Sequence, residues 1–254
     1  MKNTERFSNR VEHYIRYRPH YPQAIIPALA AITGLTPHAV VADIGAGTGI
    51  SSLPFLENGN KVLGVEPNRE MREAAEKALQ RYANFTAIAG SAEHTMLPDA
   101  CADLIVAGQA FHWFNQAAAK TEFRRIARGH GWAALIWNQR ETATGFEKDY
   151  ERLVERYAID YKITNHRNIG RKQIAAFFAP AACREQSFPN AQLFDFQGLK
   201  GRLLSASYAP DAAHPSYMAM IRELEEIFYR YEQQGMVKFH YTTKLYAGQL
   251  LPGG

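Results

Sequence analysis

The sequence predicts an α/β fold in which helices cover both faces of a mostly parallel sheet, giving a three-layer sandwich. Short apolar runs of the kind that form buried strands alternate with segments of helical spacing along the chain, which is typical of parallel α/β sheets. A glycine-rich turn joins the first apolar run to a helix. The expected strands cover residues 39–42, 61–65, 85–89, 102–107, 132–137, 193–196 and 237–245.

The first helix is expected after Pro22, because proline is favoured at the start of a helix. Ile25, Leu29 and Ile32 then fall on one face, and Gly34 ends the helix. Two later segments have the same apolar spacing. One begins at Met71 and runs to residue 82, and the other covers residues 116–127.

The last strand is expected to be antiparallel and to lie at the sheet edge. A tight loop at Gln234-Gly235 separates it from a long helix and leaves little room for the crossover that a parallel strand needs. We therefore predict seven strands, of which strand seven is antiparallel. The long helix is expected to bury five side chains, namely Met218, Ile221, Leu224, Phe228 and Tyr231.

The chain of 254 residues fits one large domain with an inserted segment. We expect four parts. Residues 1–38 form an N-terminal lid segment and the first helix, and residues 39–140 form the ligand-binding core of the sheet. Residues 141–190 form an insertion that shapes a pocket, and residues 191–254 complete the sheet.

Composition narrows the class of protein. A hydrophobic share of 46% is ordinary for a globular chain. No apolar run approaches the roughly 18 residues of a membrane-spanning helix, and the N-terminus has no signal-peptide core. Two cysteines, Cys101 and Cys183, suit reduced thiols in a cytoplasmic protein. The net charge of +4 permits acidic ligands, but the basic residues lack the interleaved aromatics of a single-strand binder, so nucleic acid is not favoured.

A glycine-rich loop, Asp43-Ile-Gly-Ala-Gly-Thr-Gly49, points to a nucleotide-type cofactor at the tip of the sheet. Glycine allows a tight strand-to-helix turn and lets the backbone approach a ligand closely. Glu66 follows the next apolar run, 21 residues after Gly45. A carboxylate at that place can accept hydrogen bonds from both hydroxyls of a ribose, which predicts a Rossmann-like adenosine site.

The dinucleotide fingerprint G-x-G-x-x-G is matched imperfectly, because Ile50 stands at its sixth position. An NAD(P)-binding oxidoreductase is therefore the first alternative. The nine histidines are dispersed and form no H-x-x-x-H or Cys/His constellation, so we expect no metal.

The order acidic-x-G-x-G-x-G resembles motif I of the class I S-adenosylmethionine (SAM) dependent methyltransferases. Over nearly its whole length the chain resembles the type 11 family, and within it the trans-aconitate methyltransferase-like subgroup. Six further sequence elements carry the resemblance. They are the Tyr14…Tyr17-Arg18-Pro19…Tyr21-Pro22 opening, Glu66-Pro67-Asn68, Gly90-Ser-Ala-Glu93, Leu97-Pro98, Gln109-Ala-Phe-His-Trp-Phe114 and Tyr241-Thr-Thr-Lys-Leu-Tyr246.

The resemblance implies a cofactor site for SAM, with S-adenosylhomocysteine as product. Asp43, Gly45, Gly47 and Thr48 would surround the methionine part, and Glu66 would bind the ribose. The resemblance also implies Pro67 and Met71 against the adenosine, and Ala92 and Glu93 against the adenine. It implies Gln109 and Ala110 at the ammonium. Tyr14 and Arg18 would belong to a lid over the cofactor, with Arg18 near the methionine carboxylate.

Acceptor contacts are expected after the fourth strand and in the insertion. His112 is a candidate general base, since the pKa of histidine lies near operating pH, although a structural role is an equal reading. Phe111 and Trp113 would wall the acceptor pocket, and Arg171 could recognise a carboxylate or simply face solvent.

The predicted activity is methyl transfer from SAM to a small molecule, with a carboxylic acid as one candidate acceptor. A second alternative is a non-catalytic protein that binds SAM, because binding residues do not prove turnover. The sequence identifies neither the acceptor nor an oligomeric state.

Overall fold

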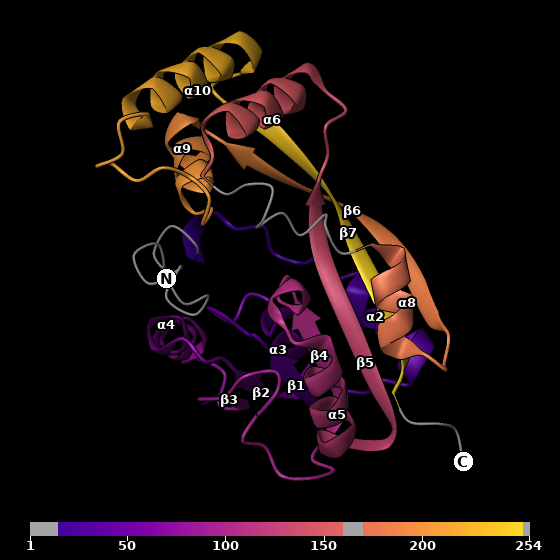
Figure 1. The fold of residues 1–254 in the computed structure, drawn as a ribbon. Helices are drawn as coiled ribbons and strands as arrows, with labels where there is room; N and C mark the ends of the chain where they lie inside the picture. The colour runs from indigo at the N-terminus through magenta and orange to yellow at the C-terminus, as the bar shows by residue number, and fades with distance from the viewer. Residues whose placement is uncertain (1–14, 160–169, 251–254) are drawn as a thin grey trace.

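The structure is a computed structural model that describes residues 15–159 and 170–250 (Figure 1). Within these residues one seven-stranded sheet has the order β3-β2-β1-β4-β5-β7-β6. The strands are β1 (Val40–Ile44), β2 (Lys61–Val65), β3 (Phe85–Ile88), β4 (Ala102–Gly108), β5 (Ala127–Arg140), β6 (Cys183–Phe194) and β7 (Val237–Gln249).

The sheet is parallel except at β7, which pairs antiparallel with both β5 and β6. The predicted seven strands and the antiparallel seventh are therefore confirmed. The predicted edge position of β7 is wrong, because β7 lies inside the sheet and β6 forms the edge. The tight turn before β7 is present, with Gln234 and Gly235 both at positive φ, 55° and 76°.

Helices cover both faces of the sheet, as predicted. They are α2 (Ile25–Thr33), α3 (Leu53–Glu57), α4 (Arg69–Leu79), α5 (Gln116–Ile126), α6 (Gly145–Tyr157), α8 (Arg171–Phe178), α9 (Phe196–Leu204) and α10 (Tyr217–Tyr231), with a short 3-10 turn η3 (Phe111–Trp113). As predicted, Gly34 ends α2, in the left-handed conformation at φ 76°.

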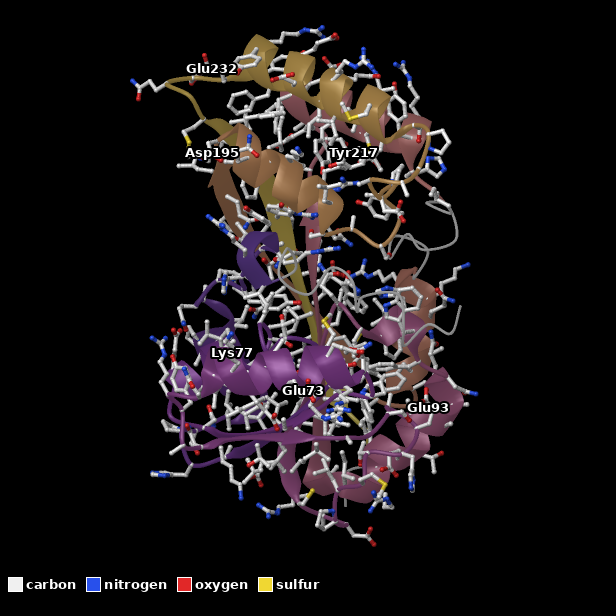
Figure 2. The ribbon with its side chains drawn as sticks, turned by 90° about the vertical axis from the view of Figure 1, so that its left-hand side faces the viewer. Glu73, Lys77, Glu93, Asp195, Tyr217 and Glu232 are labelled. Atoms are coloured by element: carbon white, nitrogen blue, oxygen red, sulfur yellow. The ribbon has the colours of Figure 1, made fainter. Side chains whose placement is uncertain are left out.

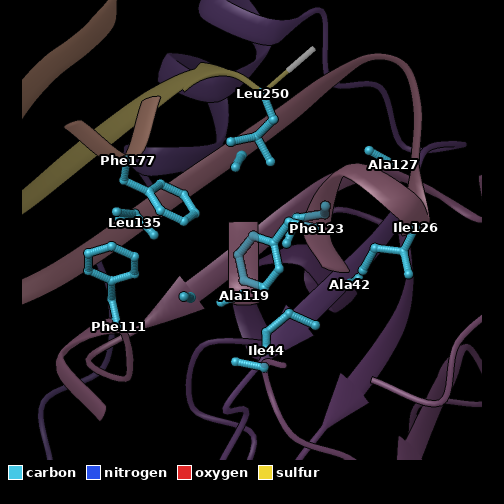
Figure 3. Packing of buried hydrophobic residues seen from close by; sticks show 14 of the residues in the cluster. Ala42, Ile44, Phe111, Ala119, Phe123, Ile126, Ala127, Leu135, Phe177 and Leu250 are labelled. Carbon is cyan, nitrogen blue, oxygen red and sulfur yellow. The ribbon is translucent and has the colours of Figure 1, made fainter. Parts of the chain in front are cut away.

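Two apolar cores lie on opposite faces of the sheet because successive strand residues point to opposite sides. In β4, Ile105 belongs to the core that contains α5 and α8 residues such as Phe123 and Phe177. Figure 3 shows Phe123 and Phe177 in that core. Leu104, the neighbour of Ile105, belongs to the other core, with side chains from α2, α3 and α4. The two cores fix the central strands, and with them the loops at their carboxyl ends.

A third apolar core forms a second lobe, which consists of α6, α9, α10 and the adjoining ends of β6 and β7. In Figure 1 these helices gather at the far end of the long strands from α4 and α5. Figure 2 shows the same division from the side, with Asp195, Tyr217 and Glu232 in the second lobe and Glu73 and Lys77 on α4. The long strands thus connect the lobes as a continuous sheet.

The sequence located the sixth strand wrongly. We expected it at residues 193–196, whereas β6 covers Cys183–Phe194 and Asp195 already caps α9 by accepting from the Gly198 amide. Most of β6 is an exposed edge strand without a run of apolar residues, so its pattern was not visible. The buried face of α10 also differs, because Met218 is exposed and Met220 and Ile227 are buried.

A polar network fastens residues 17–20 between the two lobes. Asn138 at the end of β5 donates to the carbonyl oxygens of Pro19 and His20, at 3.2 and 3.3 Å. Arg18 donates to the Ser205 carbonyl oxygen at 2.9 Å, just after α9. The start of the described chain therefore lies over the carboxyl ends of the central strands.

Two further observations concern the described residues as a whole. None of their helices combines the length and apolar character needed to cross a membrane. Cys101 and Cys183 are free, partly buried thiols.

Candidate functional site

A cavity of about 290 Å³ opens at the carboxyl ends of β1, β2, β4 and β5. This is where open α/β sheets bind ligands, because the loops after the strands diverge there. Residues 18–21 and residues 202–208 of the second lobe close the other side of the cavity. One space therefore runs from the glycine-rich loop to the second lobe.

The backbone of the glycine-rich loop can lie very close to neighbouring groups because of its three glycines. Gly45, Gly47 and Gly49 have φ values of 72°, 57° and 85°, which side-chain-bearing residues rarely adopt. A Cβ on Gly45 would lie 2.6 Å from the Cβ of Ala110. The loop after β1 can therefore lie against the exit of β4 only if residue 45 is glycine.

The Asp43 side chain stabilises the glycine-rich loop by hydrogen bonds on the side away from the cavity. Its Oδ2 accepts hydrogen bonds from the hydroxyls of Ser51 and Ser52, both at 2.7 Å. The side chain is fully buried, and burial raises its pKa to about 6, against the lowering effect of the two serines. Its Oδ1 is buried without a hydrogen-bond partner among the described residues, as is the hydroxyl of Thr48. Asp43 thus retains one acceptor position next to the loop.

Glu66 connects the glycine-rich loop to the start of α4. Its carboxylate accepts from the Gly47 amide at 3.0 Å and from the Asn68 amide at 2.8 Å. Burial raises the pKa of Glu66, while these two amides lower it. Because a carboxylate has about four acceptor positions, Glu66 can also accept from a diol in the cavity that it lines.

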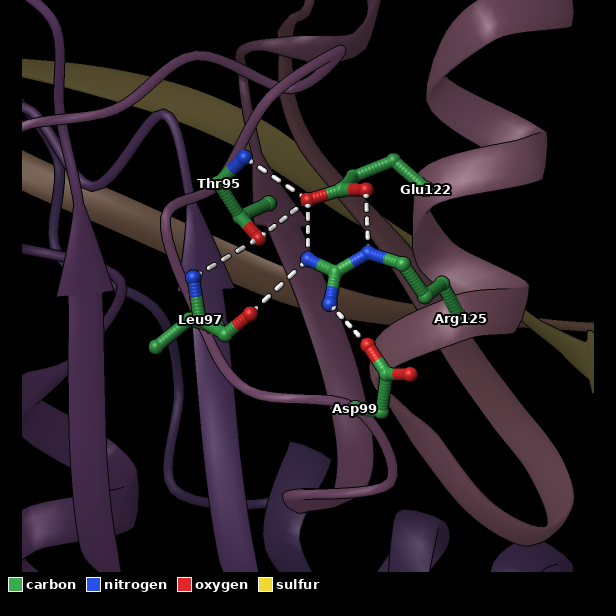
Figure 4. Close-up of polar contacts among 5 residues, drawn as sticks. All are labelled: Thr95, Leu97, Asp99, Glu122 and Arg125. Carbon is green, nitrogen blue, oxygen red and sulfur yellow. Dashed lines mark hydrogen bonds and ion pairs between the residues drawn. The ribbon is translucent and has the colours of Figure 1, made fainter.

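The loop after β3 forms the far wall of this end of the cavity through Ser91, Ala92 and Glu93. Glu93 is held in place because its carboxylate accepts from the Asn115 amide at 2.8 Å. Thr95, further along the loop, donates to the buried Glu122 of α5 from its amide and its hydroxyl (Figure 4). The adjoining wall consists of Pro67 and Met71, so apolar side chains line the cavity next to the Glu66 carboxylate.

The exit of β4 forms the middle of the cavity. Gln109 has a positive φ of 55°, and its side-chain amide donates to the Asn138 carbonyl oxygen at 2.9 Å. His112 is mostly buried, and burial together with the positive charge of Arg18 lowers its pKa to about 4. His112 is therefore neutral at pH 7. Trp113 and Phe114 add apolar surface.

Most of the predicted site residues line this one cavity. They are Arg18, Gly45, Gly47, Glu66, Pro67, Met71, Ala92, Glu93, Gln109, Ala110, His112 and Trp113.

Four predicted residues are placed outside the cavity lining, and a fifth is not described. Asp43 and Thr48 lie behind the glycine-rich loop, and Tyr14 lies outside the described residues. Phe111 is fully buried in the core, with its ring 4.7 Å from that of Phe177 between centroids, so it does not wall the pocket. Arg171 is on α8, away from the cavity, where it is exposed and paired with Glu185 at 3.1 Å.

Sequence reasoning missed the residues that line the second-lobe end of the cavity. Asn138 and Arg140 are the last part of β5, directly after the strand predicted at residues 132–137, so the rule that ligands bind at the carboxyl ends of strands would have found them. Arg202 and Tyr208 come from α9 and the segment after it, and no motif marks them. Among the described residues of the predicted insertion, 141–159 and 170–190, none lines the cavity.

The donor and acceptor groups fit a cofactor that contains an adenosine. The glycine-rich loop exposes backbone, Glu66 offers a carboxylate for a ribose, and the apolar side chains of Met71 and Ala92 suit contact with a base. The acceptor left on Asp43 suits a cationic group nearby. No cluster of three or more potential metal ligands occurs among the described residues.

Parts of the chain are similar to known methyltransferases. Residues 42–135 match the methyltransferase domain family. An uncharacterised methyltransferase of Mycobacterium tuberculosis is 34% identical over 152 residues, which are 59% of each chain. An uncharacterised methyltransferase of Schizosaccharomyces pombe is 24% identical over 97% of each chain.

A solved structure supports the fold. The putative type II methyltransferase of Anaeromyxobacter dehalogenans superimposes with a TM-score of 0.68, over 93% of this chain and 99% of that one, at 20% identity. Residues 42–135 are therefore similar to a methyltransferase domain, and the chain has the fold of that solved methyltransferase.

Proposed function

We propose that the whole chain transfers a methyl group from SAM to a small-molecule acceptor. The observation that carries this proposal is the single cavity described above. It joins an adenosine-type end around Glu66 to a second end around Arg140 and Arg202. A cofactor and an acceptor can therefore lie in one enclosed space, as direct transfer requires.

The cofactor end would be held by residues of the first lobe. Glu66 accepts from the ribose hydroxyls, and Ala92 and Met71 lie against the adenine. The backbone at Gln109 would face the ammonium of the methionine part and Arg18 its carboxylate, with the charge of Asp43 acting on the ammonium from behind the glycine-rich loop. When bound, SAM supplies a methyl group on a positively charged sulfur, whose C–S bonding electrons stay with sulfur on transfer.

The chain's own contribution to rate is mainly positional. Holding two reactants in line within an enclosed cavity removes much of the entropic barrier. The positive charge on sulfur disappears during transfer, so strong stabilisation of that charge in the ground state would slow the reaction. The apolar surface of Trp113 and Phe114 avoids such stabilisation and excludes water.

Carboxylic acids are the acceptor class that we propose first. A neutral histidine with a pKa of about 4 is poorly matched to removing a proton from an alcohol at pH 7. A carboxylate arrives already ionised and needs no base. The arginines at the second end of the cavity suit an acid, and the resemblance to the trans-aconitate methyltransferase-like subgroup agrees with that class.

The test is transfer of a labelled methyl group from SAM to a panel of small carboxylic acids, with the corresponding amides and alcohols as controls. We expect labelled product only with acids, and release of labelled methanol on mild alkaline treatment, which is characteristic of a methyl ester. Matched reactions with Glu66→Ala should lose activity through weaker SAM binding. Labelling of amides or alcohols instead would refute the choice of acids.

The two alternatives predict other outcomes. An NAD(P) oxidoreductase would be stabilised against heat by NAD(P) rather than by SAM. A non-catalytic SAM-binding protein would bind SAM but release no S-adenosylhomocysteine with any acceptor in the panel.

A further inference from the structure

The second-lobe end of the cavity contains a buried guanidinium that has no counter-charge in the described structure. Arg202, in the last turn of α9, is only 4% exposed and lines the cavity. Its Nε donates to the Tyr241 hydroxyl at 3.2 Å. Its Nη1 is buried and has no hydrogen-bond partner among the described residues, nor does Arg202 form an ion pair with any of them.

The charged surroundings of Arg202 make this arrangement costly. Its titratable neighbours are three tyrosines, Tyr150, Tyr208 and Tyr241, and a second cation, Arg140. A buried charge without a partner is strongly unfavourable, and a like charge nearby adds to the cost. Folding alone therefore does not explain why a guanidinium occupies this position.

Arg140 provides an internal comparison. It lines the same end of the cavity and is similarly buried, but it forms an ion pair with Glu151 at 2.7 Å. The charge of Arg140 is thus compensated within the protein. Of the two arginines, Arg202 is the one that forms no ion pair with an acidic side chain among the described residues.

A purely structural role accounts for only part of the Arg202 side chain. The Tyr241 hydroxyl that Arg202 contacts also donates to the Gln192 side-chain oxygen at 3.0 Å, so Tyr241 is positioned without Arg202. One hydrogen bond uses one of the five N–H donors of a guanidinium. The planar fork of the guanidinium is suited to a carboxylate or a phosphate.

We propose that Arg202 is the specificity-determining anion-binding residue of this cavity, and that it pairs with a carboxylate of the acceptor. This inference rests on the proposed function and deepens it by assigning the acceptor's charge to one residue. The acids of the cavity, Glu66 and Glu93, are at the cofactor end, so they direct an anionic acceptor toward Arg202.

The experiment measures the thermal stabilisation that a simple carboxylate gives to the protein. Sodium acetate is compared with sodium chloride at equal ionic strength, and with acetamide as the neutral analogue of the same shape. Samples are measured with and without saturating S-adenosylhomocysteine. The variants are Arg202→Met, which removes the charge, Arg202→Lys, which keeps it without the fork, and Arg171→Met, which removes an exposed arginine outside the cavity.

We expect acetate at about ten times its dissociation constant to raise the Tm of the wild type and of Arg171→Met by about 3 °C more than chloride does. Acetamide should give no such rise. The rise should be lost in Arg202→Met and reduced in Arg202→Lys. Without acetate, Arg202→Met should be at least as stable as the wild type, because it removes an uncompensated buried charge.

Three results would overturn the proposal. They are no acetate-specific rise in the wild type, the same rise in Arg202→Met, or a rise that inorganic phosphate gives and acetate does not. If Arg202→Met does not fold, an undiminished rise in Arg202→Lys overturns the assignment of the carboxylate to the guanidinium fork. Failure of the proposed function is separate, since it would appear as absence of stabilisation by S-adenosylhomocysteine in all variants.

Discussion

The ion pair between Glu122 and Arg125 on α5 should stabilise the loop that forms one wall of the cavity. Glu122 accepts from Arg125 at 2.7 and 2.8 Å and from the amide and hydroxyl of Thr95 (Figure 4). Arg125 also contacts Asp99 and donates to the Leu97 carbonyl oxygen at 2.8 Å. The change Glu122→Gln keeps the shape of the side chain and removes its charge.

The magnitude follows from the pKa of Glu122. The hydrogen bonds from Arg125, with those from Thr95, lower this pKa from 4.5 to about 2 against the opposing effect of burial. A difference of one pKa unit corresponds to about 1.4 kcal/mol, which gives an upper figure of about 3 kcal/mol. The Arg125 side chain is 36% exposed, and solvent screening reduces the figure to about 2 kcal/mol.

The pH dependence has a definite sign. Because folding lowers the pKa of Glu122, its contribution is complete above the unfolded pKa of about 4.5 and is lost as the pH falls toward about 2. Urea unfolding at several pH values between about 3 and 7 measures it. The free energy of unfolding of Glu122→Gln should be about 2 kcal/mol below that of the wild type at pH 7, and the difference should shrink below pH 4.5.

The exposed pair of Arg69 and Glu73 on α4 provides the control, with side chains 78% and 55% exposed. Glu73→Gln should leave the free energy of unfolding close to that of the wild type, because a solvent-exposed ion pair contributes little to stability. A difference between the wild type and Glu122→Gln that stays constant from pH 7 to pH 3 would refute the electrostatic reasoning. It would mean that the side chain acts by packing or neutral hydrogen bonding alone.

Three other predictions concern the cofactor end of the cavity. Gly45→Ala should weaken SAM binding at least about tenfold in isothermal titration, because it adds both backbone strain and a contact with Ala110. The control is Gly235→Ala, at a glycine with a similar φ of 76° and open space around it. This control should leave the affinity for SAM unchanged. Arg18→Ala should weaken SAM binding severalfold without unfolding the protein, and an unchanged dissociation constant would remove Arg18 from the site. The rate with an ionised acceptor should be flat between about pH 6 and pH 8, because His112 is already neutral; a step near pH 6.5 that disappears in His112→Gln would contradict the lowered pKa.

The central sheet could be predicted because its signals are local. Buried parallel strands such as β1 and β4 are short continuous apolar runs, and glycine or proline marks the neighbouring turns and helix ends. The edge strand β6 gave no such signal, because exposed residues alternate with half-buried ones along most of it and no continuous apolar run results. Its place in the sheet depends on pairing with β7, which is a long-range contact that no local pattern encodes.

The cofactor end of the site was predicted for the same reason. Gly45 and Glu66 belong to motifs whose spacing reflects the geometry of a strand, a turn and a ligand. Phe111 was assigned to the pocket wall because it lies within the same short run as Trp113. The 3-10 turn η3 instead directs it into the core.

The acceptor end could not be predicted, because its residues come from separate elements that only folding brings together. Arg202 and Arg140 are 62 positions apart in sequence, on α9 and β5. Arg171 was chosen as a basic residue of the predicted insertion, but a charged side chain there is more often part of a solvated surface. In its ion pair with Glu185 on β6, the Arg171 side chain is 82% exposed, so this is such a surface contact.

The most direct test of the central claim is isothermal titration of the folded protein with SAM and, separately, with S-adenosylhomocysteine. The cavity around the glycine-rich loop and Glu66 predicts that both bind with micromolar dissociation constants and that Glu66→Ala weakens both. Absence of binding by either compound, in a sample shown to be folded, would contradict the assignment of this cavity to SAM and would bring NAD(P) forward as the ligand.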